Sequence, residues 1–489
     1  TQLLKRYYEE LATTSNNRLA VEESVVKIAP VMLMGGLTAA LGFASLAVFN
    51  VPSLRTFGVF TALGILCGTA VELTFVPALR SLVRPRGART SLLDRAFARL
   101  MSALGRLLYR GVQTPFLAPF AVVAVIAVVG AGFLRADYTF TAYLPHGTRG
   151  ERDFLAAQRL FPGTLPLVIV AEGTDQIAPD PKLVALVSGL QRELEHQPDV
   201  VYTMSYVDVL RQAARAMGAV QDGGDLPPQR DFLYQLLFLS YTPQYGRFLS
   251  RDFKTAAVWV FLRETETERI EEVLRTAQAY VDAHDSPTRG NGARIEVAGG
   301  VAATRVALTQ EITHGKLLNI LIVLGVIGVV ASTIFRSVFG GLLVVFPLAF
   351  TVLVDLGALG ILRIPLDPIT ASVTAMAVGI GADYAIYIIY RLREELDRGD
   401  DLRAAVDRAM VGAGRGIFSV ALGIAAGYVT LTLASFRAFT MIGLLVSMTM
   451  IFSSVTSLTL LPLAVLRFRP RFVFRRAPEA LATALEPVT

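Results

Sequence analysis

Residue types that build metal, redox or nucleotide sites are scarce in this 489-residue sequence. The single cysteine, Cys67, excludes an internal disulfide and any metal site made of several cysteines. Four scattered histidines without a paired spacing argue against a zinc enzyme. The sequence also has no glycine-rich nucleotide-binding loop, which argues against ATP-driven transport. We therefore expect neither an enzyme nor a bound cofactor.

Charge is equally scarce. Only 18% of the residues are charged and 53% are apolar, whereas soluble domains carry about 25% charged residues. Lys and Arg exceed Asp and Glu by six (46 minus 40). These basic residues cluster beside apolar runs, which indicates membrane orientation and not nucleic-acid binding.

Long apolar runs are abundant, and the mean hydropathy is +0.52. A helix needs about 20 largely apolar residues to cross a membrane. Eight runs meet this requirement: Ile28–Asn50, Leu54–Leu79, Phe116–Leu134, Leu317–Phe335, Phe339–Leu362, Pro368–Tyr390, Gly416–Ala434 and Phe439–Leu466. The sequence thus predicts an α-helical polytopic membrane protein.

Basic residues also predict the orientation, because connections rich in Lys and Arg stay in the cytoplasm. Eight arginines and one acid, Asp94, lie between Arg80 and Arg110. By parity, the long stretch from Arg135 to Lys316 lies outside. The expected domains are residues 1–80 (two helices), 81–115 (cytoplasmic Arg-rich amphipathic linker), 116–134 (one helix), 135–316 (outer domain), 317–466 (five helices) and 467–489 (basic cytoplasmic tail, with Arg475 and Arg476).

Within the linker, residues Ser91 to Arg110 form a basic amphipathic pattern. Leu93, Phe97, Leu100, Leu104 and Leu108 recur at steps of three and four residues, with arginines between them. Such a helix could lie on an anionic cytoplasmic leaflet. The alternative is a linker helix packed on the underside of the protein itself.

The outer stretch is too long for a structureless loop, so we expect a folded α+β domain. The expected strands are Pro166–Glu172, Val200–Ser205, Thr255–Leu262 and Arg294–Ala298, and the expected helices are Pro181–His196 and Glu264–His284. Two β-α-β units of this kind predict a split β-α-β core. Asp231–Tyr245 is apolar for an outer segment and could be domain core or could face a greasy substrate.

The most informative pattern is a self-similarity at one offset, 385 residues (391 minus 6), without gaps. The matches include Arg6 with Arg391, Glu9-Glu10-Leu11 with Glu394-Glu395-Leu396, Gly42 with Gly427, Gly58 with Gly443, Pro77 with Pro462, and Arg84-Pro85 with Arg469-Pro470. Two related membrane halves are a common transporter architecture. On that basis the chain holds the last two helices of a first six-helix half, whose other helices would precede Thr1, and then a complete second half.

Three acids lie within predicted spans, where a charge costs about 2.5–3.5 kcal/mol. Asp383 stands eight residues, about 12 Å, before the first charge at the cytoplasmic end, Arg391. Gly379 and Gly381 would let neighbouring helices approach it closely, and Tyr384 adds a hydroxyl. We expect Asp383 to bind and release a proton. The alternative is an Asp that only joins helices by hydrogen bonds.

Asp355 and Glu72 are the other two acids. Asp355 is seven residues from the outer end of its predicted span at Leu362, so outside water could reach it. Glu72 corresponds to Ser457 across the repeat and is therefore not shared by the halves. Both are candidate accessory acids. Serines and threonines of the last span could carry protons or simply satisfy helix contacts.

The segment GIGADYAIYIIYRLREE, with Asp383 and Tyr384, resembles the Gly-x-x-x-Asp-Tyr signature of the RND superfamily in its MMPL-type branch of lipid and hydrophobe exporters. GGLTAALGFASLAVFNVPSLRTFGVFTALGILCG resembles the helix pair that follows this signature. The likeness covers nearly the whole chain apart from its Arg-rich tail. Its spacing also fits the subset that includes hopanoid exporters.

The resemblance implies a proton-driven exporter in the bacterial inner membrane, with twelve helices and periplasmic porter domains. Asp383 and Tyr384 match the proton relay of such proteins. The implied partners are membrane lipids, a hydrophobic substrate, protons and the missing N-terminal half of the same permease. The alternative function is a lipid-sensing or scaffold protein with a sterol-sensing-like helix bundle and no transport.

Overall fold

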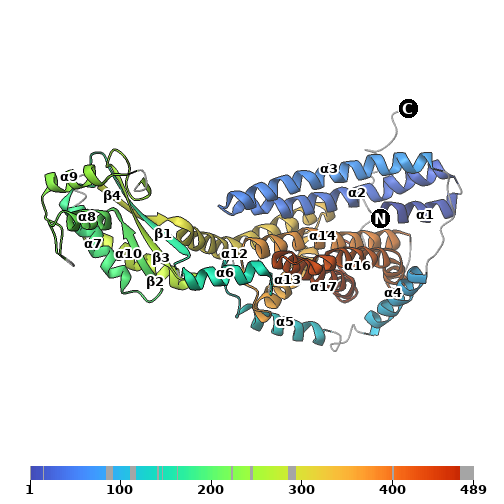
Figure 1. Cartoon of the computed structure of the whole chain (residues 1–489). Helices are drawn as coiled ribbons and strands as arrows, with labels where there is room; N and C mark the ends of the chain where they lie inside the picture. Colours follow the sequence, from blue (N-terminus) through green and yellow to red (C-terminus); the bar gives the residue numbers. More distant parts are fainter. Residues whose placement is uncertain are drawn as a thin grey trace. The chain divides into compact units, whose positions relative to one another are not determined.

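The computed structural model divides the chain into two compact units (Figure 1). The helical unit comprises Thr1–Ala136 and Glu311–Thr489, and the sheet unit comprises Asp137–Gln310. The structure describes residues 2–14, 16–83, 92–110, 117–139, 143–145, 147–161, 163–221, 224–242, 246–284, 293–398 and 401–473. Arg84-Pro85, Ser91, Phe116, Arg475 and Arg476, which the sequence predictions used, lie outside these residues.

The helical unit confirms a polytopic membrane protein. Its helices are α1 (Gln2–Thr14), α2 (Asn17–Ala44), α3 (Pro52–Leu82), α4 (Leu92–Arg110), α5 (Ala118–Ala131), α12 (Gly300–Phe335, which begins in the sheet unit), α13 (Val338–Ile361), α14 (Pro368–Asp397), α15 (Leu402–Ala409), α16 (Arg415–Val429) and α17 (Arg437–Phe468). Among the described residues, seven stretches are long and apolar enough to span a membrane. The remaining predicted span, Phe116–Leu134, corresponds to α5, whose 14 residues extend only about 21 Å.

Local sequence signals set the start of α14, which carries Asp383. Asp367 caps the helix by accepting a hydrogen bond from the Thr370 amide at 2.8 Å. The Thr370 hydroxyl in return accepts one from the Asp367 amide at 2.9 Å. Pro368 occupies the first turn, where its missing N–H has no helical partner to lose. The helix therefore begins at a fixed residue.

The 385-residue repeat is visible in the element boundaries. The 3-10 turn Ser45–Val48 after α2 matches the turn Thr430–Leu433 after α16, and α3 and α17 begin 385 residues apart. A Cβ added at Gly58 would lie 2.5 Å from the Phe43 carbonyl oxygen. One added at Gly443 would lie 2.5 Å from the equivalent oxygen of Tyr428. This pair of corresponding glycines thus makes corresponding close contacts.

The two halves exchange ion pairs at one end of the unit. Arg6 of α1 binds Glu394 of α14 at 2.5 Å, and Arg391 of α14 approaches Glu9 of α1 at 3.9 Å. These are the same pair of positions exchanged, because Arg391 and Glu394 are the repeat partners of Arg6 and Glu9. Glu395 is 1% exposed and binds Arg391 at 2.8 Å. The interface between the halves is therefore reciprocal.

Helix α4 packs one face on the helical unit. Met101 and Leu108 are buried, and the Phe97 ring meets the Phe418 ring of α16 edge-on at 5.4 Å. Leu100 and Leu107 remain about half exposed. These contacts agree with the linker-helix alternative, while the proposed contact of its exposed face with lipid stays a prediction.

The sheet unit is built on a four-stranded sheet of order β2-β3-β1-β4 in which every adjacent pair is antiparallel. Its elements are α6 (Arg149–Leu160), β1 (Leu165–Gly173), α7 (Pro181–Glu195), β2 (Val200–Ser205), α8 (Tyr206–Ala216), α9 (Arg230–Ser240), β3 (Thr255–Leu262), α10 (Thr267–His284) and β4 (Ala293–Gly299). Side chains on β1 and β3 alternate between buried and half-buried, so one face forms the core with α7 and α10. The four predicted strands and the split β-α-β arrangement are confirmed.

Helix α9 covers most of the apolar segment Asp231–Tyr245 and shows which of its residues are buried. Leu233, Leu236 and Leu237 belong to the core of the sheet unit. Phe238 and Leu239 on the same helix are 69% and 68% exposed. Three leucines of the segment are therefore core, while most of its other described residues are exposed or half-buried.

A buried arginine ties the first residues of the sheet unit to its helices. Arg305 is 4% exposed and binds Asp137 at 2.9 Å and Glu264 at 2.8 Å. Burial opposes the charge of Asp137, but hydrogen bonds from Thr267, Arg305 and Thr139 outweigh it and hold the pKa of Asp137 below its ordinary value. Burial raises the pKa of Glu264 in spite of Arg305.

Candidate functional site

The candidate site is the carboxyl of Asp383 in the middle of α14, where α14 crosses α2. The backbone of Gly35 on α2 faces this carboxyl so closely that a Cβ at Gly35 would lie 2.8 Å from the Asp383 Cγ. Thr38, one turn further along α2 and fully buried, donates to Asp383 Oδ1 at 3.4 Å. A glycine and a threonine thus form a narrow polar slot for the acid.

Small residues on both helices make the crossing close. A Cβ at Gly42 would lie 2.9 Å from the Gly379 Cα, and one at Gly379 would lie 3.2 Å from the Ala39 Cα. Gly381 instead faces α17 and α13, at 2.5 Å from Ser453 Oγ and 3.0 Å from Leu348 Cδ2 by the same measure. Both predicted glycines therefore lie at helix contacts, but against different helices.

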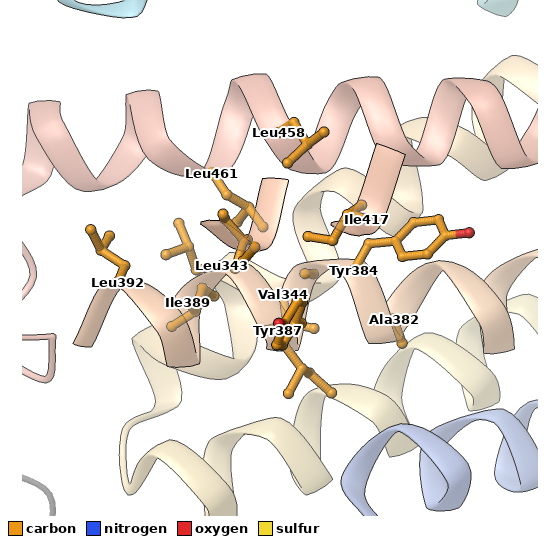
Figure 2. Close-up of a cluster of buried hydrophobic side chains, with 14 of the residues drawn as sticks. Leu343, Val344, Ala382, Tyr384, Tyr387, Ile389, Leu392, Ile417, Leu458 and Leu461 are labelled. Atoms are coloured by element: carbon orange, nitrogen blue, oxygen red, sulfur yellow. The ribbon is translucent and has the colours of Figure 1, made fainter. Parts of the chain in front are cut away.

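Tyr384 points away from its neighbour Asp383. Its hydroxyl donates to the Met450 sulfur of α17 at 3.7 Å, and the residue is 2% exposed. Figure 2 shows the Tyr384 ring beside Ile417 on the side of α14 that faces Leu458 of α17. The two signature residues thus lie on different faces of α14, and the structure does not bring their polar atoms together.

The two accessory acids lie in different surroundings. Glu72, half-buried on α3, is close enough to Asp383 for the two carboxyl groups to interact electrostatically. Asp355 on α13 is 3% exposed and accepts a hydrogen bond from Thr449 of α17 at 2.8 Å. Asp355 belongs to a second polar cluster that includes Lys316.

Sequence reasoning missed Gly35, Thr38, Thr449 and Lys316. The first three carry no charge, and only a known helix pairing reveals that they face an acid. Lys316 precedes the apolar run at Leu317, so the sequence assigns it to the edge of the outer domain. Helix α12 runs unbroken across this boundary and buries Lys316 to 4% exposure. The signal in the sequence that could have identified Lys316 was its position directly before an apolar run without charges.

The chemistry that this arrangement supports is proton binding. A carboxyl held among helices, with one weak hydroxyl donor, can exist as a neutral acid or as a carboxylate that needs compensation. Among the described residues, no group of three or more His, Cys, Asp or Glu side chains could hold a metal ion. The site therefore offers the Asp383 carboxyl as a proton-binding group at a close helix crossing, with the Glu72 carboxyl near it.

Comparison with known proteins finds similarity to one family of membrane proteins. The model of the MMPL family matches residues 3–105 and 168–483. A putative membrane protein of the archaeon Methanocaldococcus jannaschii is 22% identical over 362 residues, which cover 72% of this chain and 90% of that protein. The trehalose monomycolate exporter MmpL3 of Mycolicibacterium smegmatis is 30% identical over 152 residues, 30% of this chain and 14% of that exporter.

The fold has a solved counterpart. The hedgehog release protein Disp of the water bear Hypsibius dujardini superimposes with a TM-score of 0.61 at 12% identity, over 92% of this chain and 59% of that protein. A putative membrane protein of Streptomyces coelicolor matches 87% of this chain but only 46% of its own length. The chain thus spans about half the length of these two larger proteins.

Proposed function

The chain belongs to the MMPL family, whose model covers most of its residues, and from that premise we propose that it exports lipids or other hydrophobic molecules by using the proton gradient. The observation that carries the proposal is Asp383, a carboxyl inside a membrane helix facing the glycine backbone of α2. Ionisable groups in such places are functional by default. The exporter named in the comparisons supports a lipid as the substrate class.

The proposed cycle begins when a proton from the outside binds Asp383. Neutralising the carboxyl removes the cost of a charge beside α2, so the crossing of α14 and α2 can tighten or shift. Each proton that moves down the gradient supplies about 2.3 kcal/mol per 100 mV. Rigid shifts of the helices would then move the sheet unit, which we assign as a porter domain on the periplasmic side of the bacterial inner membrane.

The full chain reconstituted in liposomes tests this proposal. A pH-sensitive dye inside the vesicles reports proton entry, and a fluorescently labelled phospholipid serves as the transported probe. We expect Asp383→Asn to reduce both lipid transport and the coupled proton flux to the level of protein-free vesicles, because an amide cannot exchange a proton. The matched control is Asp401→Asn, which removes an exposed acid at the start of α15.

Equal lipid transport in the wild type and in Asp383→Asn contradicts proton coupling at this residue. Lipid binding by the wild type without any response to the gradient favours the lipid-sensing alternative instead.

A further inference from the structure

Four helices of the helical unit enclose a second pair of charged side chains. Lys316 of α12 and Asp355 of α13 are 4% and 3% exposed and interact electrostatically, yet they are not in direct contact as an ion pair. The Lys316 ammonium donates to the Ala371 carbonyl oxygen of α14 at 2.9 Å. Thr449 of α17 donates to Asp355 Oδ1 at 2.8 Å.

The hydrogen bonding of this pair is incomplete. The second carboxyl oxygen of Asp355, Oδ2, is buried and has no hydrogen-bond partner among the described residues. The Lys316 ammonium has three donors, of which the described residues accept one. A buried acceptor without a partner is unfavourable, because it has lost its hydrogen bonds to water. Donors and an acceptor left over in one enclosed polar site are what a bound water or a proton would satisfy.

Hydroxyl groups on α17 connect this pair to the level of Asp383. Thr449, Ser453 and Ser457 are spaced four residues apart, so they form a stripe about 12 Å long on one face of the helix. The Ser453 and Ser457 hydroxyls are buried and lack a hydrogen-bond partner among the described residues. Ser453 lies against Gly381, which is two residues before Asp383 on α14 and about 200° around the helix from it. The stripe begins at Asp355 and reaches the helix segment that carries Asp383.

The helices packed around Lys316 and Asp355 carry further ionisable residues. The other ionisable residues on the packed helices and next to them are listed here by element: Arg305, Glu311 and His314 of α12, Arg336 and Arg363 beside the ends of α13, Asp367 before α14, Asp383, Tyr384, Tyr387, Tyr390, Arg391, Arg393, Glu394, Glu395 and Asp397 of α14, and Arg437 and Arg467 of α17. Asp367 is committed to its helix cap with Thr370. Lys316 and Asp355 are therefore the ionisable pair nearest the start of α14 that no cap or surface position explains.

We infer that Lys316 and Asp355 form a second proton-binding site, which loads protons from the outside and passes them along the α17 hydroxyls toward Asp383. A hydronium ion gives its proton to Asp355 Oδ2 and leaves as water, and the carboxylate becomes a neutral acid beside the Lys316 ammonium. The acid then gives that proton to a water molecule and returns to a carboxylate, and the hydronium so formed gives the proton to the Asp383 carboxylate and becomes water again. This inference rests on the proposed proton coupling at Asp383 and names the group that supplies it.

Infrared difference spectroscopy on the full chain in liposomes tests the site without a transport assay. Spectra recorded between pH 4 and pH 9 show the C=O band of each carboxylic acid that forms inside the membrane. We expect Asp355→Asn to remove one such band and Asp383→Asn to remove another. Lys316→Gln should move the pH at which the Asp355 band titrates, while Lys316→Arg keeps it near the wild-type value.

Proton flux gives the second measurement. Asp355→Asn and Lys316→Gln should each slow the coupled flux by about 100-fold or more, the lower end of the scale on which positioned acids and bases act. Lys316→Arg and the surface control Asp401→Asn should stay close to wild type. Persistence of the Asp383 band in Asp355→Asn shows that the variant is folded.

Identical infrared spectra of the wild type and Asp355→Asn overturn the second site. So does wild-type proton flux in Lys316→Gln. If Asp355→Asn removes a C=O band but Asp383→Asn removes none, the proposed proton coupling at Asp383 fails while the second site at Asp355 stands. If Thr449→Val leaves the Asp355 band and the flux unchanged, the path along α17 is excluded.

Discussion

At the residue scale, the acid and the tyrosine of the signature have different surroundings. Asp383 faces the backbone of α2, whereas the Tyr384 hydroxyl contacts only a methionine sulfur among the described residues. Sulfur is a weak hydrogen-bond acceptor, so this contact contributes little. The two residues are adjacent in sequence but separated by about 100° around the helix.

We therefore expect Tyr384→Phe to retain most of the proton-coupled transport, with a loss of at most a few-fold. The ring would keep its packing against Ile417 and Met450, and only one weak hydrogen bond would disappear. Initial rates of dye-reported proton flux, compared with those of Asp383→Asn under the same gradient, measure the effect. A loss as complete as that of Asp383→Asn would show that the hydroxyl takes part in proton transfer.

The sequence was sufficient to select Asp383, because an acid in an apolar run stands out wherever its helix lies. It was not sufficient to find Gly35, Thr38 or Lys316 as neighbours of acids. Position along one helix is readable from sequence, but the facing residue on another helix depends on crossing angle and rotation.

At the scale of elements, the repeat provides a matched pair of glycines. Gly42 of α2 packs on the Gly379 backbone of α14, whereas a Cβ added at its repeat partner Gly427 on α16 would meet no other described side chain or helix within 4 Å. The same residue type at equivalent positions is therefore required in one half by close packing and unconstrained in the other.

We predict opposite effects for alanine at these two positions. Gly42→Ala should destabilise the helical unit by about 1–3 kcal/mol, because the added methyl forces α2 and α14 apart. Gly427→Ala should be neutral or stabilise by up to about 1 kcal/mol through helix propensity. The fraction of detergent-solubilised protein that remains monodisperse after heating measures both. Equal losses in the two variants would contradict the packing role of Gly42.

The repeat itself was predictable, because helix ends, glycines and prolines recur at one spacing in the sequence. The length of α5 was not predictable from the sequence. An apolar, charge-free run predicts a span, but the helix ends where the chain turns at Gly132, so the element is shorter than the run.

At the scale of the whole molecule, the two units have separate hydrophobic cores. A fluorescent side chain can report the unfolding of one unit independently of the other. The sequence has a single tryptophan, Trp259, and it lies on β3 of the sheet unit. Its fluorescence therefore follows unfolding of that unit alone. Short runs rich in β-branched or aromatic residues predicted all four strands, because such side chains fit the pleated surface of a sheet.

We predict a pH-dependent role for Asp137 in the stability of the sheet unit. Its folded pKa lies below its ordinary value, so its ion pair with Arg305 stabilises the fold above about pH 4 and loses this effect as the pH falls through the folded pKa. Asp137→Asn should cost about 1–3 kcal/mol at pH 7. The difference from wild type should shrink below about pH 4.

Thermal unfolding followed by Trp259 fluorescence at several pH values measures this effect. Asp153→Asn, on the exposed surface of α6, is the control. A wild-type advantage that stays constant down to pH 3 would show that Asp137 acts through shape and not through charge.

The exchanged ion pairs between α1 and α14 restrict how the halves can move. Arg6 binds Glu394 at 2.5 Å, and Arg391 approaches Glu9 at 3.9 Å. In the numbering of the repeat, each arginine contacts a glutamate three positions further along the opposite helix. Sliding one helix lengthwise past the other lengthens one contact while it shortens its counterpart, in either direction of travel. Rotation about the axis between the helices changes both equally. These contacts therefore favour rotation of one half against the other over lengthwise sliding.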